Sequence, residues 1–253
     1  VRSLPIPGWL RGLFARRQDA DWPSCVQFEL LNVCNLRCPH CTLGKGPRAD
    51  PVFFPLSSVR QLVRRIQGVP ELFTLYGRIG EPLLHPEIVE IVHAVHEIGR
   101  TRSRISSNGT LLRGELMQRL IESPLTELII ALDGATADAY GKYRKGGDFK
   151  ELCGNISAAA ESRARLGRKR RKLTTQFMPM AHNEHETEAF LRLSEALGCD
   201  GARIKISGSV CRSSRFRPQA PDPFPGRTPI IESGHCGMRK VYVDCRGEVF
   251  PCC

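Results

Sequence analysis

The chain has 253 residues, of which 41% are hydrophobic and 25% are charged, the balance of an ordinary globular protein. This balance excludes a disordered chain, and no apolar run approaches the roughly 18 residues that a membrane-spanning helix needs. The formal net charge of +11 favours acidic partners such as nucleotides, phosphates, nucleic acid or anionic lipid surfaces. The Arg-rich start lacks the apolar segment and cleavage site of a secretion signal, so we expect a cytoplasmic protein without a membrane span.

From Val26 onward, short runs of Val, Ile, Leu and Phe alternate with longer segments of helical period, a pattern typical of βα units around a parallel sheet. We predict strands near residues 26–32, 72–76, 103–106, 127–132, 173–179 and 202–207. Helices are expected near residues 56–67, 86–98, 112–121, 148–165 and 184–197. The expected helix caps are Ser57 or Ser58 and Asn183, and the expected helix stops are Gly68 and Gly198.

Two segments near the end of the chain have a different character. Residues 207–229 are rich in Pro, Ser and Arg and carry no period, which indicates a linker or a long loop. After it, residues 240–243 and 248–250 flank a turn that contains Gly247, a pattern that predicts a hairpin. Because this hairpin has little apolar surface of its own, a bound metal is expected to hold its shape.

Three cysteines follow directly on the first predicted strand, at the end where α/β proteins place their ligands. Cys34, Cys38 and Cys41 come from one tight loop, and three such thiolates can hold three irons of a cubane cluster while the fourth iron stays open. Two alternatives remain at this point. The loop can be a zinc site that lacks a fourth ligand, with His40 as a candidate, or the three thiols can be unrelated buried side chains.

The CxxxCxxC spacing after the first strand of a βα repeat resembles the radical S-adenosylmethionine (SAM) superfamily over residues from about 26 to 253. The resemblance implies an α/β fold, a partial (βα)6 barrel, and a [4Fe–4S] cluster whose open iron binds SAM. It also implies that reductive cleavage of the bound SAM yields a 5′-deoxyadenosyl radical, which abstracts hydrogen from a substrate. An electron donor such as flavodoxin or ferredoxin would then be a partner.

Further motifs at later strand ends resemble the same family. The segment Gly80-Glu81-Pro82 is similar to its GGEP motif, which implies that Gly80 and Glu81 receive the amino group of SAM, although Ile79 replaces the first glycine. An ordinary strand-to-helix turn also explains this segment. Ser107-Asn108-Gly109 resembles the TNG turn of the family, and turn chemistry alone explains it nearly as well.

The stretch from Leu132-Asp133-Gly134 to Phe149 resembles the subgroup that carries auxiliary clusters in a C-terminal SPASM or twitch domain. This resemblance implies that Arg144 pairs with the cofactor carboxylate, and a guanidinium does match a carboxylate bidentately. Ala131 stands where the subgroup has Ser, and a surface salt bridge is the alternative role for Arg144. In the segment 182–186, His and Glu residues suggest a metal site, but Asn183 and Glu186 favour a helix cap.

The order of Cys236, Gly247 and Cys252 resembles the opening of a SPASM domain, which implies that these two cysteines bind a possible second, auxiliary iron–sulfur cluster. Cys245 and Cys253 are further candidates, and a small structural zinc site is the alternative. We therefore expect four parts: an N-terminal extension (1–24), a radical SAM core (25–207), a linker (208–230) and the start of a SPASM-like domain (231–253), which looks truncated.

The resemblance favours oxidation or cross-linking of a peptide side chain, or oxidation of a small alcohol or sugar. The rival hypothesis is a non-enzymatic, zinc-stabilised protein that binds nucleic acid through its basic surface. It explains the charge and the cysteines, but not the ordered motifs at successive strand ends, so nucleic acid is not the expected partner.

Overall fold

A computed structural model of the chain describes residues 23–45, 50–66, 70–76, 79–167, 171–205 and 240–250. Its centre is one sheet with the strand order β6-β5-β4-β3-β2-β1-β7-β8. The first six strands are parallel neighbours in chain order: β1 (Cys25–Phe28), β2 (Leu72–Thr74), β3 (Arg102–Ser107), β4 (Glu127–Ala131), β5 (Lys172–Phe177) and β6 (Gly201–Ile204). This arrangement confirms the predicted α/β class and the parallel strands of a partial (βα)6 barrel.

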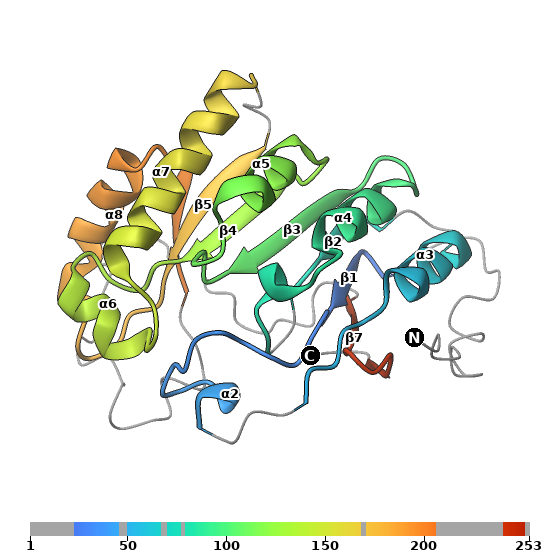
Figure 1. Cartoon of the computed structure of the whole chain (residues 1–253), viewed down its shortest axis with the longest axis horizontal. Helices are drawn as coiled ribbons and strands as arrows, with labels where there is room; N and C mark the ends of the chain where they lie inside the picture. Colours follow the sequence, from blue (N-terminus) through green and yellow to red (C-terminus); the bar gives the residue numbers. More distant parts are fainter. Residues whose placement is uncertain are drawn as a thin grey trace.

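Helices connect successive strands and lie along one side of the sheet (Figure 1). They are α2 (Thr42–Lys45) and α3 (Leu56–Arg65) after β1, the 3-10 turn η1 (Pro82–Leu84) and α4 (Ile88–His96) after β2, α5 (Gly114–Glu122) after β3, α6 (Ala137–Tyr143) and α7 (Phe149–Arg165) after β4, and η2 (Glu184–Glu186) and α8 (Thr187–Ala196) after β5. The five predicted helices are all present. The short helices α2 and α6 were not predicted, because neither is long enough to show an apolar period.

The hydrophobic core lies between the sheet and these helices. All five residues of β4 are buried, as expected for a strand in the middle of a parallel sheet. On α4, Ile88, Val92 and Val95 recur at helical spacing and belong to the same core. The sequence pattern therefore determines which face of each element packs inward.

The predicted cap of the first long helix is wrong. Helix α3 begins at Leu56 with Pro55 as its cap residue, and no side chain caps it, so neither Ser57 nor Ser58 has that role. Proline fixes φ near the value that starts a helix, which makes a hydroxyl cap dispensable. The stop at Gly198 is confirmed, because this glycine has a φ of 78° after α8, whereas Gly68 lies outside the described residues.

Asn183 does not cap the following helix through its side chain. Its Oδ1 accepts a hydrogen bond from the Met180 amide at 2.6 Å, and its Nδ2 donates to the carbonyl oxygens of Asp133 at 3.0 Å and Met178 at 3.1 Å. These three hydrogen bonds, one to the turn after β4 and two within its own loop, engage both polar atoms of the side chain. Long-range bonds of this kind outcompete a local cap, and no local pattern predicts them.

The predicted C-terminal hairpin is present, but it is part of the main sheet. β7 (Lys240–Val243) pairs in parallel with β1, and β8 (Val249–Phe250) pairs antiparallel with β7. Tyr242 and Val243 are buried, and Val243 belongs to the core, so the main sheet supports the hairpin in a way that the sequence did not predict. The proposed boundaries near 207 and 230 fall outside the described residues and stay predictions. Within the described part of the chain, no helix is long and apolar enough to cross a membrane.

Candidate functional site

A cavity of about 240 Å³ lies at the carboxyl ends of the parallel strands. Its wall brings together the six residues that the sequence motifs assigned to the first cluster and to SAM. These are Cys34, Cys38, Cys41, Gly80, Glu81 and Arg144, joined by Ser107, Asn108, Ala131 and Lys205 among others. We call this space the strand-end cavity. Successive βα loops of a parallel sheet meet at this edge, which is why motifs far apart in the sequence share one wall.

The three cysteines of residues 34–41, the cluster loop, face this cavity from a tight turn. The Cys41 amide donates to the Cys38 carbonyl at 3.1 Å, and the Gly44 amide donates to the Cys41 carbonyl at 3.0 Å. A Cβ at Gly44 would lie 2.0 Å from the Cys38 carbonyl oxygen, so only glycine lets α2 close on the loop. Backbone hydrogen bonds and the close approach at Gly44 thus define the shape of the loop.

The cysteine thiols have distinct surroundings within the cavity. Burial raises the pKa of Cys34 to about 11, against the lowering effect of a hydrogen bond from the Leu36 amide. Burial also raises the pKa of Cys38, and the positive charge of Arg144 opposes this rise. Without a cluster both groups are therefore thiols at neutral pH, and binding iron must release their protons.

Gly80 and Glu81 are held against the cluster loop by backbone and side-chain contacts. The Glu81 amide donates to the Val33 carbonyl at 2.9 Å. Gly80 has a φ of 91°, and a Cβ there would lie 2.2 Å from the Leu31 carbonyl oxygen. Glycine at position 80 is therefore required by the backbone itself.

The Glu81 carboxylate is fully buried and reaches across to the end of β3. Its Oε1 accepts from Ser107 Oγ at 2.6 Å and from the Leu83 amide at 3.0 Å, while Oε2 accepts from the Asn108 amide at 2.8 Å. Burial raises the pKa of Glu81 above its usual value, and the hydrogen bonds from these three donors oppose this rise without cancelling it. Both predicted motifs are thereby joined: the Gly80-Glu81 turn and the Ser107-Asn108 turn form one hydrogen-bonded unit.

Arg144 lies at the end of α6 and is 15% exposed, so it is not the surface salt bridge that was the alternative. Its Nε donates to Asp133 Oδ2 at 2.9 Å, its Nη2 binds the same oxygen, and its Nη1 lies 3.7 Å from Cys38 Sγ. Burial lowers the pKa of Arg144, but the combined effect of Asp133, Cys38 and Tyr143 outweighs burial, and the net shift raises the pKa. A fixed positive charge therefore stands beside the cluster loop.

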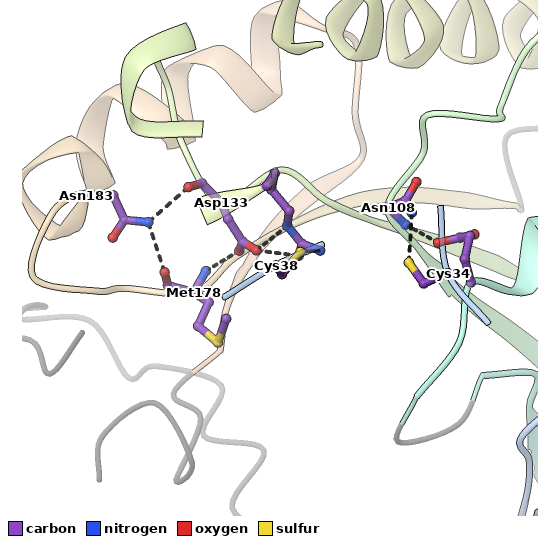
Figure 2. Close-up of polar contacts among 8 residues, drawn as sticks. Cys34, Cys38, Asn108, Asp133, Met178 and Asn183 are labelled. Carbon is purple, nitrogen blue, oxygen red and sulfur yellow. Dashed lines mark hydrogen bonds and ion pairs between the residues drawn. The ribbon is translucent and has the colours of Figure 1, made fainter. Parts of the chain in front are cut away.

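Sequence reasoning missed two contacts of this site. Asp133 was seen as part of a motif but was assigned no role. Asn108 was seen as a turn former, and its Nδ2 also lies 3.8 Å from Cys34 Sγ and donates to Asn35 Oδ1 at 2.9 Å. Figure 2 shows Asn108 beside Cys34 on one side of the site and Asp133 beside Cys38 on the other. Only their position at strand ends could have marked them.

The comparison with protein families decides the identity of this site. The family described as "Radical SAM superfamily" matches residues 28–193, which include the cluster loop and every cavity motif up to β5 and α8. The chain belongs to the radical SAM superfamily. The matched residues include the whole cluster loop, and the roles of its three cysteines stay a prediction.

Curated relatives of this radical SAM chain include enzymes of two kinds. It is 28% identical over 203 residues to mycofactocin maturase MftC of Mycobacterium ulcerans, which covers 78% of this chain and 48% of that protein. It is 32% identical over 142 residues to the GTP 3′,8-cyclase of Lactiplantibacillus plantarum, covering 54% of this chain and 41% of that protein. The chain thus spans less than half the length of these relatives.

Solved structures show the same radical SAM fold. Streptococcus suis SuiB bound to its precursor peptide SuiA superposes with a TM-score of 0.70 at 13% identity, over 92% of this chain and 60% of SuiB. The enzyme anSMEcpe with bound AdoMet and a peptide gives a TM-score of 0.60 at 15% identity, over 90% of this chain and 74% of that one. At such low identity these likenesses concern the fold.

The donor set of the cavity fits an iron–sulfur cluster better than a single metal ion. Among the residues that the structure describes, no three His, Cys, Asp or Glu side chains converge closely enough to hold one ion. Three cysteines instead face a shared volume, as they must when each thiolate binds a different iron of a cubane. Cys236 and Cys252 lie outside the described residues, and Cys245 is buried next to the end of β7.

Proposed function

We propose that this chain is a radical SAM enzyme that binds a [4Fe–4S] cluster through Cys34, Cys38 and Cys41 and holds SAM in the strand-end cavity. One observation carries the proposal: all three cysteines share a cavity wall with Gly80, Glu81 and Arg144, at the ligand-binding edge of the parallel sheet. When bound, the cluster and SAM supply a 5′-deoxyadenosyl radical that abstracts hydrogen from a substrate.

The residues around the cavity are suited to hold the two charged ends of a methionyl group. Glu81 uses three acceptor sites within the protein, and a carboxylate offers about four, so one site remains for an ammonium. Arg144 faces the same cavity with a permanent positive charge that suits a carboxylate. We therefore assign the amino group to Gly80 and Glu81 and the carboxylate to Arg144.

The substrate class that we propose is a peptide. Support comes from the likeness to mycofactocin maturase MftC and from the fold shared with SuiB, whose structure holds a precursor peptide. A small alcohol or sugar is the second candidate, and GTP 3′,8-cyclase shows that relatives of this chain also act on small molecules. The proposed partners are this substrate and a one-electron donor such as flavodoxin or ferredoxin, in the cytoplasm. An auxiliary cluster at Cys236 and Cys252 completes the proposal.

The test is anaerobic reconstitution of the chain with iron and sulfide, followed by metal analysis and electron paramagnetic resonance of the reduced protein. We expect a [4Fe–4S] signal that changes when SAM is added, because the cluster loop supplies three thiolates for four irons. Stoichiometric zinc without reconstitutable iron would overturn the proposal and favour the zinc-stabilised, nucleic-acid-binding alternative.

A pair of cysteine variants provides the matched control. Cys38 is a member of the cavity wall, whereas Cys199 packs against the hydrophobic core after α8. Cys38→Ala should abolish the reductive formation of 5′-deoxyadenosine, and Cys199→Ala should retain it. Equal activity of the two variants would remove Cys38 from the cluster site.

A further inference from the structure

Asp133 occupies an unusual backbone position in the turn between β4 and α6. It is fully buried and has a φ of 48°, a left-handed conformation that few residues other than glycine adopt. Two bonds from the loop after β5 hold it there. The Met178 amide donates to Asp133 Oδ1 at 2.7 Å, and Asn183 Nδ2 donates to the Asp133 carbonyl at 3.0 Å (Figure 2).

The turn that contains Asp133 is also locked by its neighbours. A Cβ at Gly134 would lie 2.6 Å from the Tyr140 nitrogen, so α6 packs directly on the turn. Glu186 Oε2 accepts from the Ala135 amide at 2.7 Å. Backbone strain and buried bonds of this kind persist only where the surrounding structure over-determines them. The carboxylate of Asp133 is consequently fixed in space before any ligand arrives.

The second oxygen of this carboxylate holds Arg144. Both Nε and Nη2 of the guanidinium bind Asp133 Oδ2, which fixes the plane of the group and turns Nη1 toward Cys38 Sγ, 3.7 Å away. A guanidinium has five N–H groups, and these contacts use three of them. Two N–H groups thus have no partner among the described residues, on a side chain that lines the strand-end cavity.

We propose that Asp133 is a positioning residue that aims Arg144 at the carboxylate of SAM beside Cys38. Asp133 is fully buried and both of its oxygens are used within the protein, so it acts on the ligand only through Arg144. An unrestrained arginine side chain loses rotamer entropy when it is immobilised on a ligand, and the buried carboxylate removes that cost in advance. This inference rests on the proposed function.

The test compares two ligands in wild type and in Asp133→Asn. Asparagine keeps an oxygen for the Met178 amide and tolerates a left-handed φ, but it places an amide nitrogen against Arg144. We measure the Kd of SAM and of decarboxylated SAM by anaerobic equilibrium dialysis. The measured quantity is the Kd of decarboxylated SAM divided by the Kd of SAM. This ratio should be roughly 10- to 100-fold smaller in Asp133→Asn than in wild type, the range for losing an outer partner of a ligand-binding group.

Only a loss of positioning changes the ratio of the two affinities, because general damage to the cavity weakens both ligands alike. Asp148→Asn is the matched control: Asp148 caps α7 by accepting from the Glu151 amide at 2.7 Å, and its variant should keep the wild-type ratio. Iron content and thermal unfolding are recorded for each variant. Asp133→Glu, which keeps the charge but displaces it by one methylene, is the second variant in case Asp133→Asn does not fold.

The outcomes separate the two proposals. If wild type binds neither ligand, the proposed function fails together with this inference. If wild type prefers SAM and a folded Asp133 variant keeps the same preference, the role of Asp133 is overturned while the proposed function stands. A preference lost in both Asp133→Asn and Arg144→Lys, with no further loss in the double variant, supports one shared contact.

Discussion

At position 80, a side chain would collide with the backbone of the preceding loop. The φ of Gly80 is 91°, and its added Cβ would lie 2.2 Å from the Leu31 carbonyl oxygen, an atom that cannot move aside without shifting the chain. Gly80 is therefore needed for the fold of this loop, independently of cofactor binding. The folding role of Gly80 follows from the structure, whereas its role in binding SAM is part of the proposed function.

We predict that Gly80→Ala destabilises the fold by more than the roughly 1–2 kcal/mol that a left-handed backbone costs alone. Gly99→Ala is the matched control, because Gly99 has a φ of 115° but nothing within 4 Å of its added Cβ. Chemical denaturation of both variants measures the difference. Equal losses of stability would show that the loop around Leu31 relaxes and that the close approach is unimportant.

His85 is a buried neutral imidazole that joins the segment after η1 to the loop before α3. Its Nδ1 accepts from the Glu87 amide at 3.1 Å, so its Nε2 carries the proton and donates to the Phe54 carbonyl at 3.0 Å. Burial lowers the pKa of His85 below its usual 6.5. The unfolded chain therefore binds a proton more readily than the folded one at mildly acidic pH.

We predict a pH-dependent difference between wild type and His85→Gln. The contribution of neutral His85 to stability is complete above about pH 6.5 and is lost as the pH falls toward the lower pKa of the folded state. Glutamine can keep the donor to Phe54 but not the acceptor for Glu87, which costs about 1 kcal/mol. The stability gap between the two proteins, measured by denaturation, should narrow from pH 7.5 to pH 5; a constant gap would contradict it.

At the scale of elements, β7 pairs with β1, the strand that precedes the cluster loop. Glu29, directly after β1, is buried, and its Oε2 accepts from the Ile79 amide at 3.3 Å and from the Tyr242 hydroxyl. One carboxyl group thus connects the turn before Gly80 with the last described hairpin. The docking of β7 therefore supports the wall of the strand-end cavity.

We predict that Tyr242→Phe lowers the free energy of unfolding by about 1–3 kcal/mol, since it leaves a buried carboxyl group with one donor fewer. It should also weaken SAM binding, because the same carboxyl group holds the Ile79 amide. A double-mutant cycle with Glu29→Gln measures the coupling by denaturation and equilibrium dialysis. Strictly additive effects would mean that the hydroxyl and the carboxyl act independently.

At the scale of the whole molecule, the predicted auxiliary site lies apart from the cluster loop in the sequence. In the sequence, Cys236 and Cys252 flank the hairpin of β7 and β8, which belongs to the main sheet. Both cysteines lie outside the described residues, so the auxiliary site stays a prediction.

We predict that a chain in which Cys34, Cys38 and Cys41 are all replaced by Ala still binds iron or zinc after desalting. The retained metal, measured by elemental analysis, would belong to the late cysteines. Further replacement of Cys236 and Cys252 by Ala should then remove it. A triple variant that is already free of metal, also when the chain is extended beyond Cys253, would show that the late cysteines are not ligands.

Local patterns predicted the strands, the long helices and the cluster loop, because hydrophobic period and cysteine spacing are properties of neighbouring residues. The same patterns failed for α6, which has seven residues and Gly141 in its interior. They also failed for Asn183, because its side chain donates a hydrogen bond to the Asp133 carbonyl, fifty positions away, and makes no cap bond to its own helix. Short elements and long-range bonds depend on packing that a local window does not contain.

By itself, the sequence determined the α/β class, the three-cysteine loop and the motifs at successive strand ends. Each of these features depends on residues that are close together along the chain. Only the tertiary structure decided that Glu81 binds Ser107, 26 positions later, and that Tyr242 binds Glu29 across 213 positions. The physical reason is the strand order, because parallel pairing sets which loops meet at the edge of the sheet. The backbone hydrogen bonds that pair the strands are the same for nearly all residue types, so the local sequence does not specify the pairing.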